Sequence, residues 1–357
     1  MKVGILTFHR AINFGAVLQA YALQEVLSSL GQEVRVINYM QPRVENTDRR
    51  KFKDTDKLDL LKGFHLRAFF TYDRNKDNEK KKRARFDKFI QKYIHLSEEC
   101  TSDSIPDNYD VYVVGSDQVW NSNICGGIDD IYWGNFKRKS SSLLISYAAS
   151  TSVANLKSMP QEMLQSFLCN YDYMSTRETD VASYLNSNFK LKEPLKVVLD
   201  PTLLASPQIW DAMKDDTITQ PEPYVLYFGA RCYAKNPHIL EIHAQKIATK
   251  MGLSVRTIDF NRMSPIDFVN AFRNASYVVS SSFHGVAFSI IFNKPLNAIV
   301  YGDEQDSRYV NLLKMVGADD MIHDVSDFSI LDYNYTTINN GIESLRKESM
   351  DYLNKIL

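Results

Sequence analysis

The chain has 357 residues, of which 44% are hydrophobic and 24% are charged, a composition that argues against a disordered or membrane-embedded protein. Its 42 basic and 43 acidic residues give a formal net charge of −1, so nothing global attracts nucleic acid or an anionic membrane. Because a single core stops growing at roughly 250–300 residues, the length predicts two domains.

The four cysteines are scattered and form no CxxC pair, which fits neither a zinc site nor a disulfide scaffold. No run of about 18 apolar residues predicts a transmembrane segment. The apolar stretch at residues 3–8 is too short for the core of a signal peptide. We therefore expect a cytoplasmic protein that binds no nucleic acid.

The first 40 residues have the pattern of a strand, a helix and a second strand. A strand is predicted over 3–7, and apolar residues then recur at helical spacing over 14–30. Gly31 ends this helix, and the next strand is predicted over 34–37. A βαβ unit of this kind implies a parallel sheet.

Residues 41–100 are interpreted as an excursion from that sheet. Residues 41–75 are polar and aperiodic, whereas a helix is predicted over 76–93. The basic run at 80–83 invites a nucleic-acid or lipid interpretation, but acidic residues flank it, which favours a solvated helix face.

Strand and helix patterns alternate along the rest of the chain, as in doubly wound α/β domains. Proline-marked breaks at 200–202 and 220–223 place the domain boundary between them. We expect an N-terminal Rossmann-like lobe over 1–205, on the acceptor side, and a C-terminal Rossmann-like lobe over 222–330, on the donor side. A helix over 340–357 should pack back across the lobes. Further strands are predicted at 111–114, 143–146, 171–174, 196–199, 224–228, 254–258, 276–279 and 296–300.

Open parallel sheets bind ligands beyond the carboxyl ends of their strands, and the least generic polar segments follow the predicted strands repeatedly. Loops are polar in any fold, so this pattern locates a cleft without naming a reaction. The residues that we expect to line it are Asn13, Gly15, Ser116, Asp117, Trp120, Asn121, Arg231 and Asn261.

Some of these polar segments suggest anion binding. Arg177 and Arg308 each have the chemistry to hold a phosphate or a carboxylate, with a surface arginine or a helix ion pair as the alternative. The serines at 280–282 lead from a strand into a helix, where hydroxyls and free N–H groups favour an anion. The absence of GxxxxGK and GxGxxG argues against P-loop and dinucleotide chemistry.

His284 is the candidate catalytic acid or base. It precedes Gly285 at a junction between a strand and a helix, although a structural core histidine remains the alternative. No metal-binding motif is present, so no metal is expected. Asp117 with Asp129 and Asp130 could hold a cation, but hydrogen bonding to sugar hydroxyls fits equally well.

In these segments the chain resembles the polysaccharide pyruvyl transferase family over most of its length. The resemblance implies two GT-B-like lobes with a cleft between them. The motifs that carry it, in this order, are Asn13-Phe14-Gly15, the segments 114–121, 175–178 and 200–204, and Ser281-Ser282-Phe283-His284-Gly285.

The resemblance also implies an activity: transfer of pyruvate from phosphoenolpyruvate to a sugar of a surface polysaccharide or its precursor, as a ketal and without a cofactor. The acceptor would be a sugar, an oligosaccharide or a lipid-linked sugar. Carried over, His284 is the general acid/base and Arg177 binds the donor. Some members have arginine where this chain has Ser282, so Arg308, Ser281, Ser282 and the backbone at Gly285 are candidates for the donor phosphate.

Two alternatives remain. One is a glycosyltransferase of the same architecture that uses a nucleotide sugar. The other is a non-catalytic carbohydrate-binding protein on the same scaffold, which Ser282 favours and the presence of both His284 and Arg177 disfavours.

Overall fold

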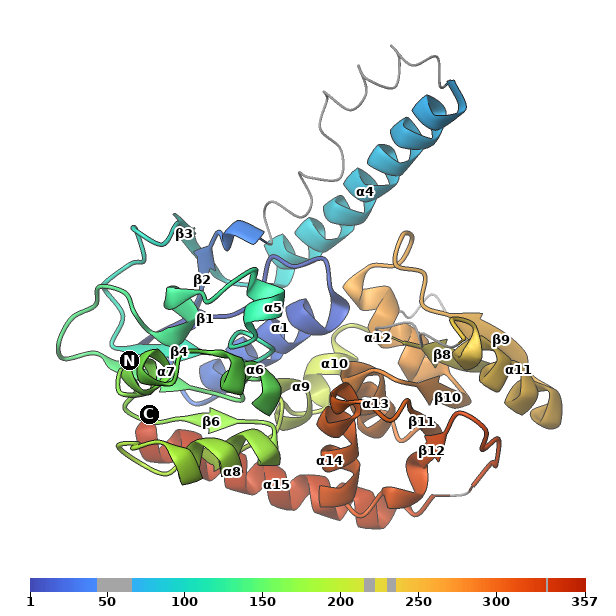
Figure 1. Cartoon of the computed structure of the whole chain (residues 1–357). Helices are drawn as coiled ribbons and strands as arrows, with labels where there is room; N and C mark the ends of the chain where they lie inside the picture. The colour runs from blue at the N-terminus through green and yellow to red at the C-terminus, as the bar shows by residue number, and fades with distance from the viewer. Residues whose placement is uncertain (44–65, 215–221, 230–235, 332) are drawn as a thin grey trace.

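Two α/β lobes lie side by side in the computed structural model, and a C-terminal helix, α15 (Tyr335–Ile356), runs beneath both of them (Figure 1). The structure describes residues 1–43, 66–214, 222–229, 236–331 and 333–357.

The N-terminal lobe is built on a parallel sheet with the strand order β3-β2-β1-β4-β5. Because β1 pairs with β2 on one side and β4 on the other, the order in which the chain adds strands to the sheet reverses between β1 and β4. Parallel sheets open a crevice at such a point. The strands are β1 (Lys2–Leu6), β2 (Glu33–Tyr39), β3 (Leu96–Cys100), β4 (Val111–Val114) and β5 (Leu143–Ser146).

Helix α1 (Phe14–Ser29) starts at this crevice. Asn13 is its N-cap, with the side-chain oxygen accepting from the Ala16 N–H. The helix is buried on nearly all sides because it lies between the two lobes. The other helices of this lobe are α4 (Leu66–Tyr93), α5 (Ser122–Cys125), α6 (Val153–Ser158), α7 (Gln161–Leu168), α8 (Thr179–Asn188), α9 (Pro201–Leu204) and α10 (Gln208–Asp211).

Only part of the segment 41–100 is the predicted excursion from the sheet. Helix α4 returns the chain to the sheet, and β3 pairs with β2 at the edge. The sequence pattern missed β3 because an edge strand carries polar residues, as Leu96–Cys100 does. The part of the excursion over 44–65 lies outside the described residues.

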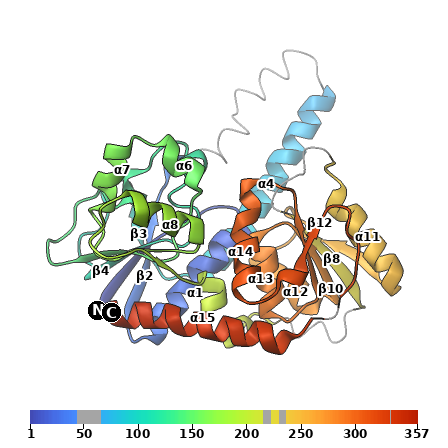
Figure 2. The same cartoon turned by 60° about the horizontal axis from the view of Figure 1, so that its bottom comes forward.

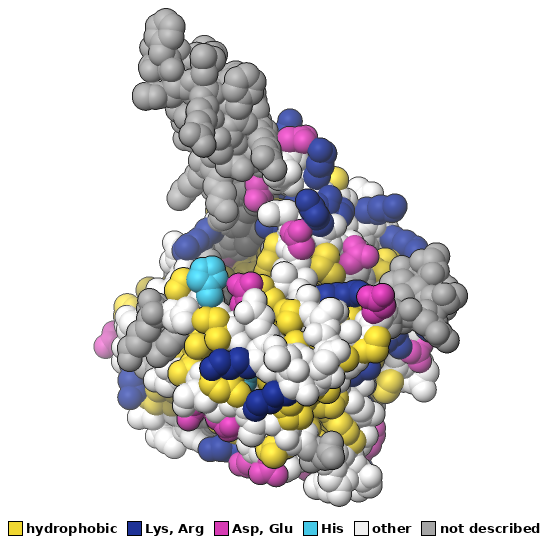
Figure 3. All heavy atoms as spheres, turned by 90° about the vertical axis from the view of Figure 1, so that its right-hand side faces the viewer, with side chains coloured by type: hydrophobic (Ala, Val, Ile, Leu, Met, Phe, Trp, Pro, Cys, Tyr) yellow, Lys and Arg dark blue, Asp and Glu magenta, His cyan; other side chains and the backbone are white. Residues whose placement is uncertain are grey.

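The described side chains of α4, at 77–93, carry mixed charge. In the upper part of Figure 3, acidic side chains lie among basic ones. Lys81 pairs with Asp77 at 2.6 Å and Arg83 with Asp87 at 3.4 Å. These pairs agree with a solvated helix face.

The strand predicted at 171–174 is displaced by a few residues. The chain there forms only a short strand, β6 (Ser175–Thr176), which pairs with β7 (Lys196–Val197). This small sheet continues the carboxyl edge of β5 through a bridge between Ala149 and Thr176. Arg177 therefore follows directly at the edge where ligands bind.

The C-terminal lobe repeats the design, with the parallel order β12-β11-β10-β8-β9 and a switch between β8 and β10. The α/β fold with two doubly wound lobes is thus confirmed. The elements are β8 (Tyr224–Phe228), α11 (Ile239–Met251), β9 (Ser254–Thr257), α12 (Pro265–Asn274), β10 (Tyr277–Ser280), α13 (Phe283–Ile291), β11 (Leu296–Val300), α14 (Ser307–Met315) and β12 (Ile322–Asp324).

Aromatic side chains join the lobes. Phe14 of α1 stacks on Phe268 of α12 at 4.9 Å between centroids, and lies 5.2 Å from Phe86 of α4 and 5.1 Å from Phe260. The hydrophobic core is therefore continuous from one lobe to the other.

Helix α15 fastens the lobes from below (Figure 2). On the N-terminal side the Ser349 hydroxyl accepts from the Leu199 N–H at 2.9 Å, and the Tyr352 hydroxyl donates to the Ser146 carbonyl at 3.0 Å. On the C-terminal side Gly341 faces Val316, and a Cβ at position 341 would lie 2.9 Å from the Val316 Cα.

We expect Gly341→Ala to lower the free energy of unfolding by about 1–2 kcal/mol, because the added methyl overpacks a contact with backbone. Helix propensity alone predicts the opposite sign, a gain of about 1 kcal/mol. Urea unfolding of this variant beside Asn340→Ala, at an exposed position of the same helix, measures the difference. A stabilised Gly341→Ala would contradict the close docking of α15.

Candidate functional site

The two switch points face each other, and His284 lies at their junction. It is the second residue of α13, on the turn that follows β10. Its ring lies against Gly15 at the start of α1, so that a Cβ at position 15 would overlap the imidazole. Glycine at position 15 thus makes room for a side chain from the opposite lobe.

Two polar atoms on this turn are buried without a hydrogen-bond partner among the described residues. They are Nε2 of His284 and the hydroxyl of Ser281, although His284 as a whole residue is only half-buried. Leaving a buried polar group unpaired costs about 1–3 kcal/mol, so such atoms are rare in native proteins. Their presence together indicates a place where a ligand or water completes the hydrogen bonding.

The start of α13 is uncapped by side chains. Ser282 occupies the N-cap in extended backbone (φ −122°, ψ 137°) but makes no side-chain capping bond, and the first turn holds no acidic residue. Ser281 and Ser282 are both buried. A helix of this length with free N–H groups and no competing carboxylate favours an anion at its N-terminus.

The missing side chain of Gly285 serves packing. A Cβ there would overlap the Ser280 hydroxyl and lie 3.1 Å from a ring carbon of Phe228. Its missing side chain lets α13 lie close to β8 and β10. Packing thus explains why the residue is glycine, while the Gly285 N–H belongs to the first turn of α13 and stays a predicted partner of the donor.

Arg177 lies inside the protein, surrounded by carboxylates. Its side chain is 3% exposed, with Nη1 donating to Asp200 at 2.8 Å and Nε to Glu178 at 3.0 Å. Its Nη2 lies 3.7 Å from Asp117. All three guanidinium nitrogens thus face acids of the same lobe. No side of the guanidinium is left open for the predicted contact with the donor.

The guanidinium also supports the turn that carries His284. It lies over the ring of Phe283, with 4.3 Å between its central carbon and the ring centroid. Burial alone would lower the pKa of Arg177, but Glu178 and Asp200 raise it, so the group stays charged. Arg177 is therefore a positioning residue that joins the N-terminal acids to the start of α13.

The carboxylates around Arg177 are held by further hydrogen bonds. Asp200 accepts from the Ser116 hydroxyl at 3.2 Å and from the N–H and hydroxyl of Thr202 at 3.0 and 2.7 Å. Burial acts to raise the pKa of Asp200, yet His284, Arg177 and the Thr202 bonds together lower it. Burial raises the pKa of Glu178, although Arg177 opposes the shift. Ser116, a predicted cleft residue, is thus buried and helps to hold Asp200 in place.

The electrostatics of His284 favour a neutral ring. Burial lowers its pKa, and the Arg177 and Arg308 charges act in the same direction. Asp200 and Asp117 oppose this shift without overcoming it. In the described conformation His284 is therefore poised to accept a proton rather than to carry one.

An interlobe cleft of about 730 Å³ lies between the N-terminal lobe and the segment 303–308. Of the predicted residues it brings together Asn121 and Arg308, and Asp117 adjoins it through Gln118. The lining residues are Gln118, Asn121, Asn123, Ile124, Thr151, Ser152, Ala154, Asn155, Ser158, Asp303, Gln305, Ser307 and Arg308.

Other predicted cleft residues lie elsewhere. Trp120 is 1% exposed, stacks on Trp133 at 4.9 Å, and belongs to the core. Asn13 is exposed and caps α1. Asn261 is exposed on the loop after β9, where its carbonyl accepts from Arg85 of α4. Arg231 lies outside the described residues.

The sequence interpretation missed the α6 side of the cleft. Thr151, Ser152 and Asn155 follow β5, which ends at the same edge as the other site segments. The signal was available, because the polar run at 150–152 comes shortly after a predicted strand. This polar run does not stand out in the sequence, because hydroxyl-rich loops are common and residues 150–152 include no charged side chain.

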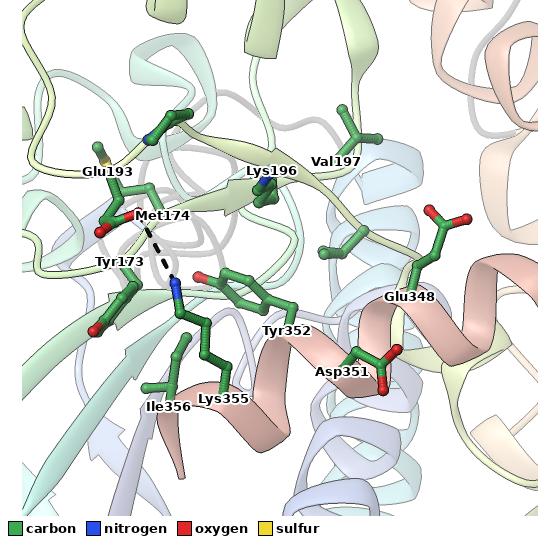
Figure 4. A pocket seen from close by; sticks show the side chains of 12 residues that line it. Tyr173, Met174, Glu193, Lys196, Val197, Glu348, Asp351, Tyr352, Lys355 and Ile356 are labelled. Atoms are coloured by element: carbon green, nitrogen blue, oxygen red, sulfur yellow. Dashed lines mark ion pairs between the residues drawn. The ribbon is translucent and has the colours of Figure 1, made fainter.

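A second hollow of about 360 Å³ lies between the β6–β7 segment and the end of α15 (Figure 4). The Tyr352 hydroxyl on its wall is committed to the Ser146 carbonyl, and Lys355 lies 3.9 Å from Glu193. Among the described lining residues, none has a buried polar atom without a partner. The hollow lacks the features that mark the turn at His284.

In the described part of the chain, no three His, Cys, Asp or Glu side chains converge as metal ligands. Asp129, considered above for a cation, instead accepts from Gln41 and from the Tyr39 hydroxyl, each at 3.1 Å. Over the same residues, no helix has the length and apolar character needed to cross a membrane.

The fold is a pair of doubly wound α/β lobes, and the turn that carries His284 lies where they meet. The family model for polysaccharide pyruvyl transferase matches residues 13–304, most of the chain. The chain belongs to this family, which confirms the resemblance seen in its motifs. Curated proteins give no match.

Several solved structures are similar over nearly the whole chain. The UDP-GlcNAc 2-epimerase of Methanocaldococcus jannaschii is 13% identical, covers 97% of this chain and 93% of its own, and has a TM-score of 0.47. The enzyme of Neisseria meningitidis is 12% identical, with coverages of 98% and 99% and a TM-score of 0.46. A spinosyn rhamnosyltransferase is 10% identical, with coverages of 98% and 96% and a TM-score of 0.43. No function is transferred from them.

We expect Arg177→Ala to lower the free energy of unfolding by about 3–5 kcal/mol, because it leaves buried carboxylates without their cation. Urea unfolding measures this, with Arg262→Ala, at a side chain 87% exposed, as the control that changes stability by less than about 0.5 kcal/mol. Wild-type stability together with weakened donor binding would instead support a direct donor contact.

Proposed function

We propose that the protein transfers a pyruvyl group from phosphoenolpyruvate to a sugar of a surface polysaccharide or its precursor, forming a ketal across two hydroxyls. One observation carries the proposal: the buried, unpartnered Nε2 of His284 lies beside the uncapped start of α13. Family membership over residues 13–304 supports the reaction class.

Phosphoenolpyruvate presents a phosphate and a carboxylate, and the site offers separate partners for them. The first-turn N–H groups of α13 with the hydroxyls of Ser281 and Ser282 suit the phosphate. Arg308, on the cleft wall and near enough to affect His284, suits the carboxylate. With the phosphate held by N–H groups and hydroxyls and the carboxylate held by Arg308, the donor needs no arginine at position 282, where some family members have one. No metal or organic cofactor is needed in this proposal.

The proposed reaction balances its protons between two sugar hydroxyls and the donor. The first hydroxyl adds to C2 of phosphoenolpyruvate, and one proton ends on the methylene carbon, which becomes a methyl group. The second hydroxyl then forms its bond to C2 as the C2–O bond to phosphate breaks, and its proton leaves with the phosphate. We assign to Nε2 of His284 the acceptance of a hydroxyl proton, because a lowered pKa keeps the ring neutral.

Incubation with phosphoenolpyruvate and a library of sugars and lipid-linked sugars tests the proposal. A modified acceptor gains about 70 Da, the mass of pyruvic acid less one water. The reaction releases one equivalent of inorganic phosphate for each ketal formed. Parallel arms replace the donor with UDP-, GDP- and CMP-sugars. Transfer from a nucleotide sugar without transfer from phosphoenolpyruvate would replace the proposal with a glycosyltransferase. Sugar binding without any transfer would favour the non-catalytic alternative.

We expect His284→Ala to reduce kcat by roughly 10²–10⁴, the usual contribution of a positioned proton-transfer group. The melting temperature and donor affinity should stay near wild type, because the removed Nε2 makes no hydrogen bond with the described residues. His284→Gln serves as a second variant that keeps a polar side chain without the titratable ring. If both variants keep a near wild-type kcat at saturating donor, His284 is not the acid or base of the reaction.

The pH profile should reflect the lowered pKa of His284. Because the ring remains a neutral base to lower pH, the acid limb of kcat/KM should fall below the ordinary histidine value of 6.5. Asp117→Asn removes a carboxylate that raises the pKa of His284, and should move this limb further toward acid. The limb of kcat should lie at higher pH, since bound phosphate favours the protonated ring. An acid limb of kcat/KM above 6.5 would contradict the lowered pKa of His284, and a profile without an acid limb would contradict the base role.

A further inference from the structure

The interlobe cleft extends beyond the reacting centre. None of its lining residues comes from the turn 281–285, although Arg308 at its edge is near enough to lower the pKa of His284. A sugar that reacts beside His284 therefore has the cleft open next to it, between α5, α6 and the segment 303–308.

The lining chemistry suits neutral, hydroxyl-rich molecules. Amide and hydroxyl side chains dominate the described lining, and its charged members, Arg308 and Asp303, have opposite signs. Amides both donate and accept, as sugar hydroxyls require. Ile124, 39% exposed among these polar groups, offers an apolar contact for the C–H face of a pyranose ring.

Hydrogen bonds fix some of the polar side chains that line the cleft, and others stay available to a ligand. Asn155 is 4% exposed, and its side chain accepts from Thr151 at 3.1 Å and donates to Ser122 at 2.8 Å. Asn121 donates to the side-chain oxygen of Gln118 at 2.9 Å. That contact leaves the Gln118 Nε2 without a partner among the described residues, and Asn123 presents its amide at the exposed start of α5.

The volume exceeds what one sugar fills. At about 730 Å³ the cleft lies in the upper part of the range of roughly 300–1,000 Å³ that is usual for sites holding molecules larger than one hexose. The donor does not account for this space, because its proposed partners lie mainly on the turn at His284.

We propose that this cleft is a subsite for a second, neutral sugar linked to the one that receives pyruvate. The acceptor is then a chain of at least two sugars, recognised through Gln118, Asn123 and Ile124. This inference rests on the proposed function, since it takes the reacting sugar to lie beside His284.

Calorimetry in the presence of phosphoenolpyruvate tests the subsite. The probes are methyl glycosides of the common hexoses and N-acetylhexosamines, and the disaccharides that carry the same terminal units. We expect the preferred disaccharide to bind at least about tenfold more tightly than its terminal monosaccharide, as one or two added hydrogen bonds provide.

Asn123→Ala and Ile124→Asp should each remove most of that disaccharide advantage and leave the affinities for monosaccharide and phosphoenolpyruvate unchanged. Asn339→Ala, an exposed amide on α15 outside the cleft, is the matched control and should leave all three affinities unchanged. Equal binding of mono- and disaccharides, or an advantage that survives both cleft variants, overturns the subsite.

Failure of the subsite and failure of the proposed function give different results. If phosphoenolpyruvate binds and transfers to a monosaccharide as well as to its disaccharide, the function stands and the subsite is overturned. If disaccharides bind with the cleft-dependent advantage but phosphoenolpyruvate neither binds nor reacts, the sugar subsite stands on its own and the pyruvyl transfer is overturned.

Discussion

A single buried cation holds together the residues around the start of α13. Arg177 lies among Asp117, Glu178 and Asp200, each from a different segment of the N-terminal lobe, and stacks on Phe283 of the other lobe. Water does not compete for these contacts, so they are directional and strong once formed. Removing the cation would leave the acids buried and unpaired, which is more costly than losing a surface ion pair. The cluster thus gives the turn at His284 a defined position relative to the N-terminal acids.

The lobes are joined in ways that leave the cleft between them open. Phe14 packs against aromatic residues of both lobes on one side of Gly15, and α15 ties the sheets together from below. The polar edges of the sheets face each other across the remaining space. Apolar contacts thus close part of the interface between the lobes, and a polar cleft remains open beside the turn that carries His284.

The two parts of the site differ in their electrostatics. The turn at Ser281 and Ser282 offers N–H groups and hydroxyls without a competing carboxylate, which suits an anion. The cleft beyond it combines amides and hydroxyls with one basic and one acidic residue, which suits a neutral ligand. The two regions meet at Arg308, which lines the cleft and lies close enough to His284 to lower its pKa.

Local sequence patterns determined most of the elements and where the site would lie. The helix predicted over 14–30 forms over Phe14–Ser29, and the strand predicted over 296–300 forms over Leu296–Val300. These predictions succeed because periodicity, caps and turn residues act over a few neighbours. The polar segments after the strands also located His284 and Arg308 correctly at the junction of the lobes.

The tertiary structure alone decided what many of those residues contact. Arg177, expected as a donor ligand, is buried among carboxylates, because Asp117 and Asp200 reach it from segments distant in the chain. Trp120 lies in the core, where it stacks on Trp133, and the missing side chain of Gly285 makes room for Ser280. Residue type and spacing state what a side chain is able to bind. Which partner it binds depends on distances across the fold, and a one-dimensional pattern carries no information about those.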